Sequence, residues 1–296
     1  MSNASVHRPP RTVLFGMPGA LLSATLQVLE RLDVPLLAIV TPAPQGSSAA
    51  VVEQNWHSRR GPWHPNRPNT GRVTHMLVKS AREPVLIARI QEIAPELMVI
   101  ACFPWLLPNA LYRSATWLAV NLHPSLLPAH RGPDPLFWTF FAGESRTGVS
   151  LHRLDNQFDT GPVLAQSEIA VSPGTSYHHL EQETASYSAE LLSNLILRYP
   201  EIPPSVVQTS VAPSNEGKAT SDDLLIHPDW SVDRTRRFIA GVATSHGPLR
   251  YPLANGRSIK ITDLSLGPDS TEIVLRNGTL GVKQAPSRQV FPADTH

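Results

Sequence analysis

Apolar and polar positions are grouped along the first part of the chain in a way that predicts alternating strands and helices. Short apolar runs at 12–16, 34–41 and 97–103 are typical of buried strands. Between the first two, residues 20–32 carry leucines at helical spacing, and a helical stretch precedes the third run. Because strands that alternate with helices build parallel sheets, this order predicts an α/β domain.

The alternation of predicted strands and helices continues to residue 200. It predicts a strand over 118–123, a helix over 135–144, two strands over 147–154 and 162–171, and a long helix over 176–200 that ends at a proline. Together these elements predict an α/β fold with an open, mostly parallel, Rossmann-like sheet over residues 1–200.

After residue 200 the pattern changes. Residues 201–225 are rich in proline, serine and polar side chains, which is typical of a linker. Short β-type runs follow at 257–266 and 271–284, and the second contains "RNGT", which predicts a hairpin with a tight Asn-Gly turn. We therefore expect a small β-rich domain over residues 226–296.

Composition narrows the class of protein. The 296 residues are 41% hydrophobic and 17% charged, which fits a folded globular chain. The formal net charge of +1 provides no overall attraction to nucleic acids or anionic membranes. The sequence has one cysteine, Cys102, and no leader-like or membrane-spanning apolar run. We therefore expect a cytoplasmic protein without a membrane partner.

Residues 54–72 form a segment of unusual composition. They include Trp56, Trp63 and four arginines, and they contain no acidic residue. Two interpretations stay open: the segment is a surface insertion, or it is a ligand-facing loop whose aromatic rings stack and whose arginines neutralise phosphates.

The stretch "NLHPSLLPAHRG" at 121–132 carries candidate chemistry. On a strand, Asn121 and His123 share one face, and Pro124 favours an extended conformation for His123. They would lie at the end of a parallel strand, where ligands bind in such sheets. An amide can stabilise an oxyanion and an imidazole can move a proton near neutral pH. A purely structural Asn and His would give the same spacing.

Asp159, ahead of a Thr-Gly-Pro turn, supplies a possible third group. An oxyanion donor, a proton carrier and a carboxylate that raises the pKa of that carrier are sufficient for acyl transfer. Arg131 either contacts an anionic substrate or pins the loop. Cys102 fits a small core side chain better than a nucleophile. His178, His179 and Glu183 fit a solvated first helical turn, so we expect no metal site.

The central motif, followed by "PLFWTFFAGE", "TGVSLHRLD" and "FDTGPVLAQ", resembles the folate-dependent formyltransferase family over about residues 12–200. The resemblance implies that Asn121, His123 and Asp159 are catalytic and that 10-formyltetrahydrofolate is the co-substrate. It implies direct transfer of the formyl group to an amine. It also implies folate contacts, largely through main-chain groups, at Phe103, Trp105, Leu106, Leu107, Gln157 and Phe158.

The C-terminal part resembles, more weakly, the small β-barrel of the methionyl-tRNA formyltransferase group. In relatives the loop after the first strand faces the formyl acceptor. This resemblance implies acceptor contacts at Met17, Pro18, Gly19, Ser125 and Arg131.

The acceptor itself is less constrained. The loop "FGMPGALL" departs from the Gly-Thr-Pro pattern usual in the methionyl-tRNA enzymes, and basic and acidic residues are equal in number from residue 201 onward. Both features favour a small amine, such as an amino sugar nucleotide or an amino acid-like metabolite. Methionyl-tRNA, water in a hydrolase, and folate binding without catalysis remain alternatives. The sequence does not indicate an oligomeric state.

Overall fold

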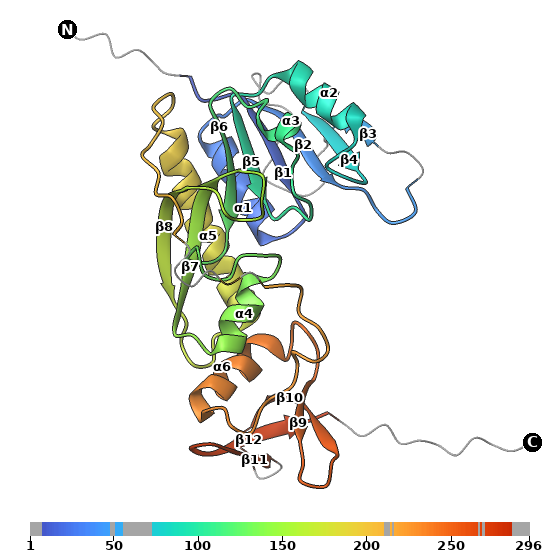
Figure 1. Ribbon diagram of the computed structural model, residues 1–296, viewed down its shortest axis with the longest axis vertical. Coiled ribbons are helices and arrows are strands. Elements are labelled where there is room, and N and C mark those ends of the chain that lie inside the picture. Colours follow the sequence, from blue (N-terminus) through green and yellow to red (C-terminus); the bar gives the residue numbers. More distant parts are fainter. Residues whose placement is uncertain are drawn as a thin grey trace, which may run out of the picture. The chain divides into compact units, whose positions relative to one another are not determined.

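The chain is described from a computed structural model, in residues 8–47, 51–55, 73–209, 214, 216–265, 267 and 270–285. It divides into two compact units (Figure 1). The first comprises the residues up to Pro135, Arg146–Ala170 and Glu181–Gly217. The second comprises Leu136–Ser145, Val171–Leu180 and the residues from Lys218 onward. Our sequence-based domain limits at residues 200 and 225 stay a prediction.

An eight-stranded sheet forms the centre of the first unit, in the order β3-β4-β2-β1-β5-β6-β7-β8. The five strands from β4 to β6 run parallel, and β3, β7 and β8 are antiparallel to their neighbours. This confirms the predicted open, mostly parallel sheet. The strands are β1 (Thr12–Gly16), β2 (Leu36–Pro42), β3 (Val51–Asn55), β4 (Thr74–Val78), β5 (Leu97–Ala101), β6 (Leu118–His123), β7 (Arg146–Arg153) and β8 (Val163–Ala170).

Helices pack on this sheet through apolar stripes. Leu22, Leu26 and Leu29 of α1 (Ala20–Arg31) are buried, as their spacing predicts. Strands β1 and β5 are buried along their whole length, as expected of parallel strands that are covered on both faces. The unit also contains α2 (Pro84–Ile93), α3 (Asn109–Tyr112) and, from Glu181 onward, α5 (Tyr177–Ile196).

Strands β3 and β4 were not predicted. β3 overlaps the segment 54–72 at its last two residues, and among the described strands it pairs with β4 alone, at the edge of the sheet. A short edge strand needs little apolar alternation, so its sequence signal is weak. Of the segment 54–72, only residues 54 and 55 are described, as the end of β3. Its basic and aromatic residues lie outside the described residues.

The second unit contains a four-stranded antiparallel sheet in the order β11-β12-β10-β9, which confirms the expected small β-rich part. The hairpin turn differs from the prediction. Leu275 pairs with Gly278, so Arg276 and Asn277 form the turn, one residue earlier than an Asn-Gly turn. The strands are β9 (Leu249–Pro252), β10 (Ser258–Leu264), β11 (Thr271–Leu275) and β12 (Gly278–Gln284).

Two helices of the second unit carry an aromatic core. They are α6 (Val232–Val242), which was not predicted, and α4 (Pro135–Ala142), which belongs to this unit from Leu136 onward. Ser231 caps α6 by accepting a hydrogen bond from the Arg234 backbone. The Arg234 guanidinium lies 3.9 Å from the centre of the Trp230 ring.

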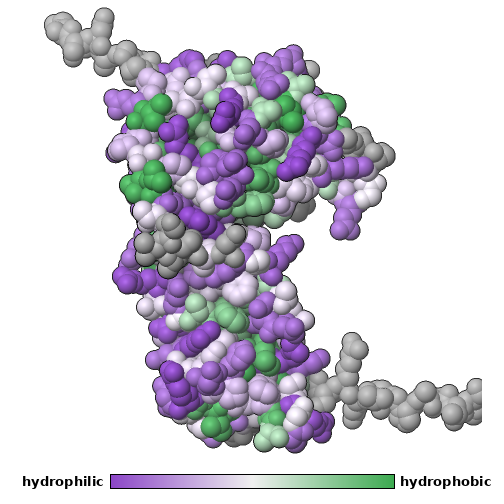
Figure 2. Space-filling view, in the orientation of Figure 1, coloured by the Kyte–Doolittle hydropathy of each residue, from purple (hydrophilic) through white to green (hydrophobic). Residues whose placement is uncertain are grey.

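Hydrophilic and hydrophobic residues are interspersed over the face drawn in Figure 2. Among the described helices, none combines the length and the apolar character needed to cross a membrane.

Candidate active site

Three loops come together at the carboxyl ends of neighbouring parallel strands. β5 lies between β1 and β6, with Gly16 paired to Ala101 and Ile100 paired to Asn121. The Met17 backbone N–H donates to the carbonyl oxygen of Cys102 at 2.8 Å. The loops that follow β1 and β5 therefore adjoin the end of β6, where a parallel sheet most often binds its ligand.

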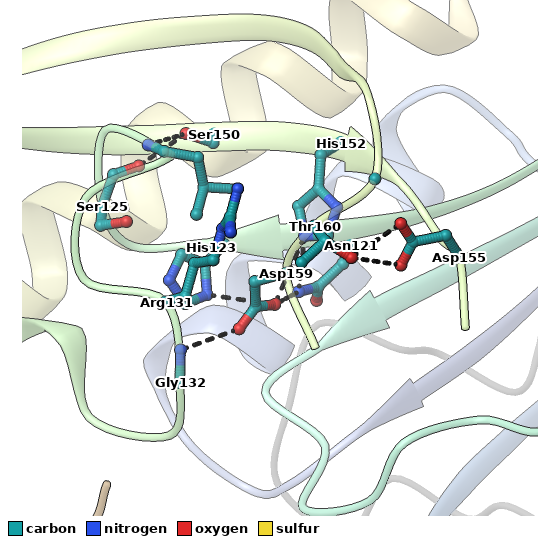
Figure 3. Close-up of polar contacts among 12 residues, drawn as sticks. Asn121, His123, Ser125, Arg131, Gly132, Ser150, His152, Asp155, Asp159 and Thr160 are labelled. Atoms are coloured by element: carbon teal, nitrogen blue, oxygen red, sulfur yellow. Dashed lines mark hydrogen bonds and ion pairs between the residues drawn. The ribbon is translucent and has the colours of Figure 1, made fainter. Parts of the chain in front are cut away.

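The structure brings Asn121, His123 and Asp159 together (Figure 3). Asn121 and His123 belong to β6, and Asp159 lies in the loop between β7 and β8. Asn121 Nδ2 donates to Asp159 Oδ1 at 3.0 Å. The same carboxylate oxygen lies 3.6 Å from His123 Nδ1. A half-buried amide thus lies beside a buried imidazole and a buried carboxylate.

Asp159 is held as an anion. Its Oδ2 accepts a hydrogen bond from the Gly132 backbone N–H at 3.0 Å. Burial raises the pKa of the carboxyl group, but His123, His152 and the Gly132 N–H outweigh burial and lower the pKa to about 2. The carboxylate is therefore ionised at neutral pH.

His123 is buried and keeps a neutral ring at neutral pH. Its Nε2 lies 2.8 Å from the carbonyl oxygen of His130, which assigns the ring proton to Nε2 and leaves Nδ1 facing Asp159. Burial lowers the pKa of His123, and the opposing effects of Asp159 and the His130 carbonyl only partly offset it. We expected Asp159 to raise the pKa of His123. Asp159 does raise it, but burial has the larger effect, so the expected net direction is wrong.

His152 also belongs to this site, although it was not predicted from the sequence. His152 lies on β7 directly opposite Asn121 and is buried. Its Nδ1 donates to the Arg153 carbonyl at 2.9 Å, so its Nε2 is free to accept from Asn121 Nδ2 at 3.1 Å. Nε2 also lies 3.5 Å from Asp159 Oδ1. His152 lies within the predicted strand 147–154, but only the strand register places it opposite Asn121.

Ser125 and Ser150 hold the loop after β6 in shape. The Ser125 side chain is fully buried and donates to the Ala129 carbonyl at 2.7 Å. Ser150 Oγ donates to the Ser125 carbonyl at 2.6 Å and accepts from Leu127 N at 3.0 Å. The Ser125 hydroxyl is thus turned into its own loop, and its predicted contact with a substrate stays a prediction.

Residues from the predicted linker contact the loop after β6. These contacts were not predicted from the sequence. The Arg131 guanidinium donates through Nε and Nη2 to Gln208 Oε1, at 3.1 and 2.6 Å. Glu216 Oε2 lies 2.8 Å from His130 Nδ1. The backbone of Arg131 exchanges hydrogen bonds with Ser214 and Glu216. These contacts hold Arg131 in the loop, and its predicted contact with a substrate stays a prediction.

The predicted folate contacts differ in exposure. Phe103 and Trp105 are half-buried, and their rings meet edge to face at 5.3 Å. Phe158, beside Asp159, leaves 50% of its surface exposed. Leu107, in contrast, is buried in the core, so its side chain is directed away from solvent. Of the other predicted folate contacts, Leu106 is half-buried and Gln157 is exposed. Met17, Pro18 and Gly19, which were predicted to contact the acceptor, are exposed.

Comparison with known sequences identifies relatives of this chain. The formyl transferase family model matches residues 48–196. The chain is 28% identical over 241 residues to a methionyl-tRNA formyltransferase of Syntrophus aciditrophicus, which covers 80% of this chain and 74% of the relative. It is 30% identical over 200 residues to a methionyl-tRNA formyltransferase of Dehalococcoides mccartyi. That match covers 66% of this chain and 64% of the relative, just under two thirds of its length.

Solved structures share the fold at low sequence identity. An N-formyltransferase from Helicobacter canadensis, in complex with folinic acid and dTDP-3-aminofucose, has a TM-score of 0.61 at 14% identity, over 93% of this chain and 98% of that one. A methionyl-tRNA formyltransferase from Clostridium thermocellum has a TM-score of 0.56 at 11% identity, over 93% and 99%. HypX from Aquifex aeolicus, in complex with tetrahydrofolic acid, has a TM-score of 0.58 at 14% identity, over 92% and 43%.

Proposed function

Because this chain belongs to the formyl transferase family, we propose that it transfers the formyl group of 10-formyltetrahydrofolate directly to an amine. The observation that carries the proposal is the contact of the half-buried Asn121 with the buried His123 and Asp159 at the end of β6. These groups can stabilise a negative oxygen and move a proton, which are the two requirements of acyl transfer.

The reaction balances without an oxidant or a reductant. The amine nitrogen forms a bond to the formyl carbon, and the bond from that carbon to the folate nitrogen breaks. One proton leaves the amine and one arrives on the folate nitrogen. The protein must therefore stabilise charge on the formyl oxygen and carry a proton between two nitrogens.

Asn121 is the proposed donor to the formyl oxygen. Its Nδ2 now donates to Asp159 and lies within hydrogen-bond distance of His152 Nε2. The formyl oxygen would take the place of one of these two acceptors. The bond that remains would keep the amide oriented, and such a preorganised donor is worth about 10²–10³ in kcat.

His123 is the proposed proton carrier. Its neutral ring can accept a proton from the attacking amine, and the adjacent Asp159 carboxylate stabilises the imidazolium that results. Since burial of His123 disfavours the charged ring, the proton is readily passed on to the folate nitrogen.

The residues around this cluster are compatible with a folate. Phe103 and Trp105 follow β5, and the half-exposed ring of Phe158 is next to Asp159. Aromatic rings at the rim suit a planar heterocycle, whose polar edge would then meet main-chain groups of these loops. For Leu107 we propose a main-chain contact only, because its side chain is buried.

We propose a small amine as acceptor, for the two reasons found in the sequence: the unusual loop Met17–Gly19 and the neutral C-terminal part. Methionyl-tRNA is the second candidate. It is favoured by the names of both relatives described above. The Helicobacter canadensis structure, with a bound amino sugar nucleotide, favours the first.

An acceptor screen tests both parts of the proposal. The protein is mixed with 10-formyltetrahydrofolate, and loss of the formyl group is followed with amino sugar nucleotides, amino acid-like amines, methionyl-tRNA or water alone. We expect one small amine to give the highest kcat/KM. Activity with methionyl-tRNA alone would contradict the small-amine acceptor and leave formyl transfer intact. No release of formyl to any acceptor would contradict the proposed function.

The screen is repeated with Asn121→Ala, His123→Ala and Asp159→Ala. Each should lower turnover by about 10² or more while circular dichroism stays unchanged. Gln91→Ala serves as a control, since Gln91 lies on α2 and contacts only the Ala110 carbonyl in the described hydrogen bonds. Full activity of His123→Ala would contradict the assignment.

A further inference from the structure

We propose that Gln208 is a positioning residue that holds the Asp159 carboxylate in its working orientation. Gln208 lies outside the central motif, in the stretch 201–225 that was predicted to be a linker. The inference rests on the proposed function, because it assigns Gln208 a task within the same site.

The Gln208 amide joins two loops of the site. Its Nε2 donates to the carbonyl oxygens of Asp159 and Gly161, at 2.9 and 2.7 Å. Its Oε1 accepts both hydrogen bonds from Arg131. Both N–H groups and both lone pairs of the amide are therefore used, so that the side chain has a single orientation.

These bonds close a ring around Asp159. The residue is held at its carbonyl by Gln208 and at its carboxylate by the Gly132 N–H. Gly132 follows Arg131, which is held by Gln208 in turn. The backbone and the side chain of Asp159 are thus both tied to the loop that contains Arg131 and Gly132.

The backbone conformation of Asp159 requires support from the surrounding residues. Its backbone lies in the left-handed region, with φ of 56°, which non-glycine residues rarely adopt unless the surroundings impose it. Misplacement of a catalytic group by about 1 Å can cost about 10² in rate.

Simple anchoring of the polypeptide explains the contacts less well. Val206 and Val163 already exchange two backbone hydrogen bonds of 2.8 Å, which attach this stretch to the edge of the sheet. The Gln208 amide is not required for that attachment. Its four bonds are instead directed to the loops that carry Asp159 and Arg131.

The test uses a readout that needs neither folate nor acceptor. Titratable groups facing His123 are Asp159, His152 and His130, and Glu216 contacts His130. Of these, Asp159 raises the pKa of His123. If Gln208→Ala lets the carboxylate move away, the pKa of His123 should fall, as measured from the ¹⁵N shifts of its ring in the full-length protein.

Activity gives the second readout. We expect Gln208→Ala to lower kcat by about 10–10² while the KM for the folate changes little. Gln208→Met fills the same space without hydrogen bonds, so it serves if the alanine variant folds poorly. Gln91→Ala, which also removes an amide bonded to a backbone carbonyl, should change neither readout.

A double-mutant cycle with Arg131→Ala then tests the closed set of hydrogen bonds that joins Gln208, Arg131, Gly132 and Asp159. The effects of the two substitutions on the activation free energy, calculated from kcat, should be less than additive, because each breaks the same set of hydrogen bonds. The proposal is overturned if both Gln208 variants fold and leave the His123 titration and kcat unchanged, or if kcat falls only in proportion to the folded fraction. A wild-type protein without formyl transfer would instead overturn the proposed function, and the His123 titration would still decide the role of Gln208.

Discussion

At the residue scale, opposite effects set the charges of the two titratable members of the cluster. Asp159 is anionic because His123, His152 and the Gly132 N–H together outweigh burial, and His123 is neutral because burial outweighs its anionic neighbour. The sequence was enough to select both residue types and to place Asn121 and His123 on one strand. It could not predict the net pKa of His123, which depends on the burial created by packing.

The charge of His123 leads to a pH prediction. Because the neutral ring is the proton acceptor and its pKa is lowered, kcat/KM should begin to fall only below the ordinary histidine value of 6.5. Asp159→Asn should move this acid limb to still lower pH, since it removes the group that raises the pKa. The measurement is the pH profile of kcat/KM for both proteins, and an acid limb above pH 7 in the wild type would contradict a buried, neutral His123.

At the scale of elements, the positions of most strands along the chain could be predicted, and the register between strands could not. Apolar runs located β1, β5 and β6, whose carboxyl ends surround the site. His152 was missed because only the pairing of β6 with β7 sets it opposite Asn121. Gln208 was missed because a polar, proline-rich stretch has no periodicity that would assign it a neighbour. Long-range hydrogen bonds decide both positions.

The turn between β7 and β8 offers a test at this scale. A Cβ atom on Gly161 would lie 1.8 Å from the Arg153 carbonyl oxygen, so Gly161→Ala must displace backbone next to Asp159. We expect a loss of about 1–3 kcal/mol in the free energy of unfolding, measured by chemical denaturation, together with reduced kcat. Gly267→Ala, where a Cβ would meet open space, should stay within about 0.5 kcal/mol of the wild type. Equal stability of the two variants would contradict the close packing of this turn.

At the scale of the whole molecule, the chemistry belongs to one of the two units. All members of the cluster, and Gln208, lie in the unit with the eight-stranded sheet. The match to the formyl transferase family, over residues 48–196, includes Asn121, His123, His152 and Asp159. The second unit has its own sheet and aromatic core. Its sequence predicted β10, β11 and β12, but neither β9 nor α6. The amphipathic helix α6 was not predicted because short β-type runs led us to expect only strands in this part of the chain.

The formyl carbon itself provides the most direct test of the central claim. 10-Formyltetrahydrofolate labelled with ¹³C in the formyl group is incubated with the protein and the best amine of the screen, and ¹³C NMR identifies the carrier of the label. We predict that the label moves from the folate to the amine, and that Asn121→Ala slows this transfer by about 10²–10³. Label that stays on the folate, or that appears as free formate at the same rate with and without the amine, would contradict formyl transfer.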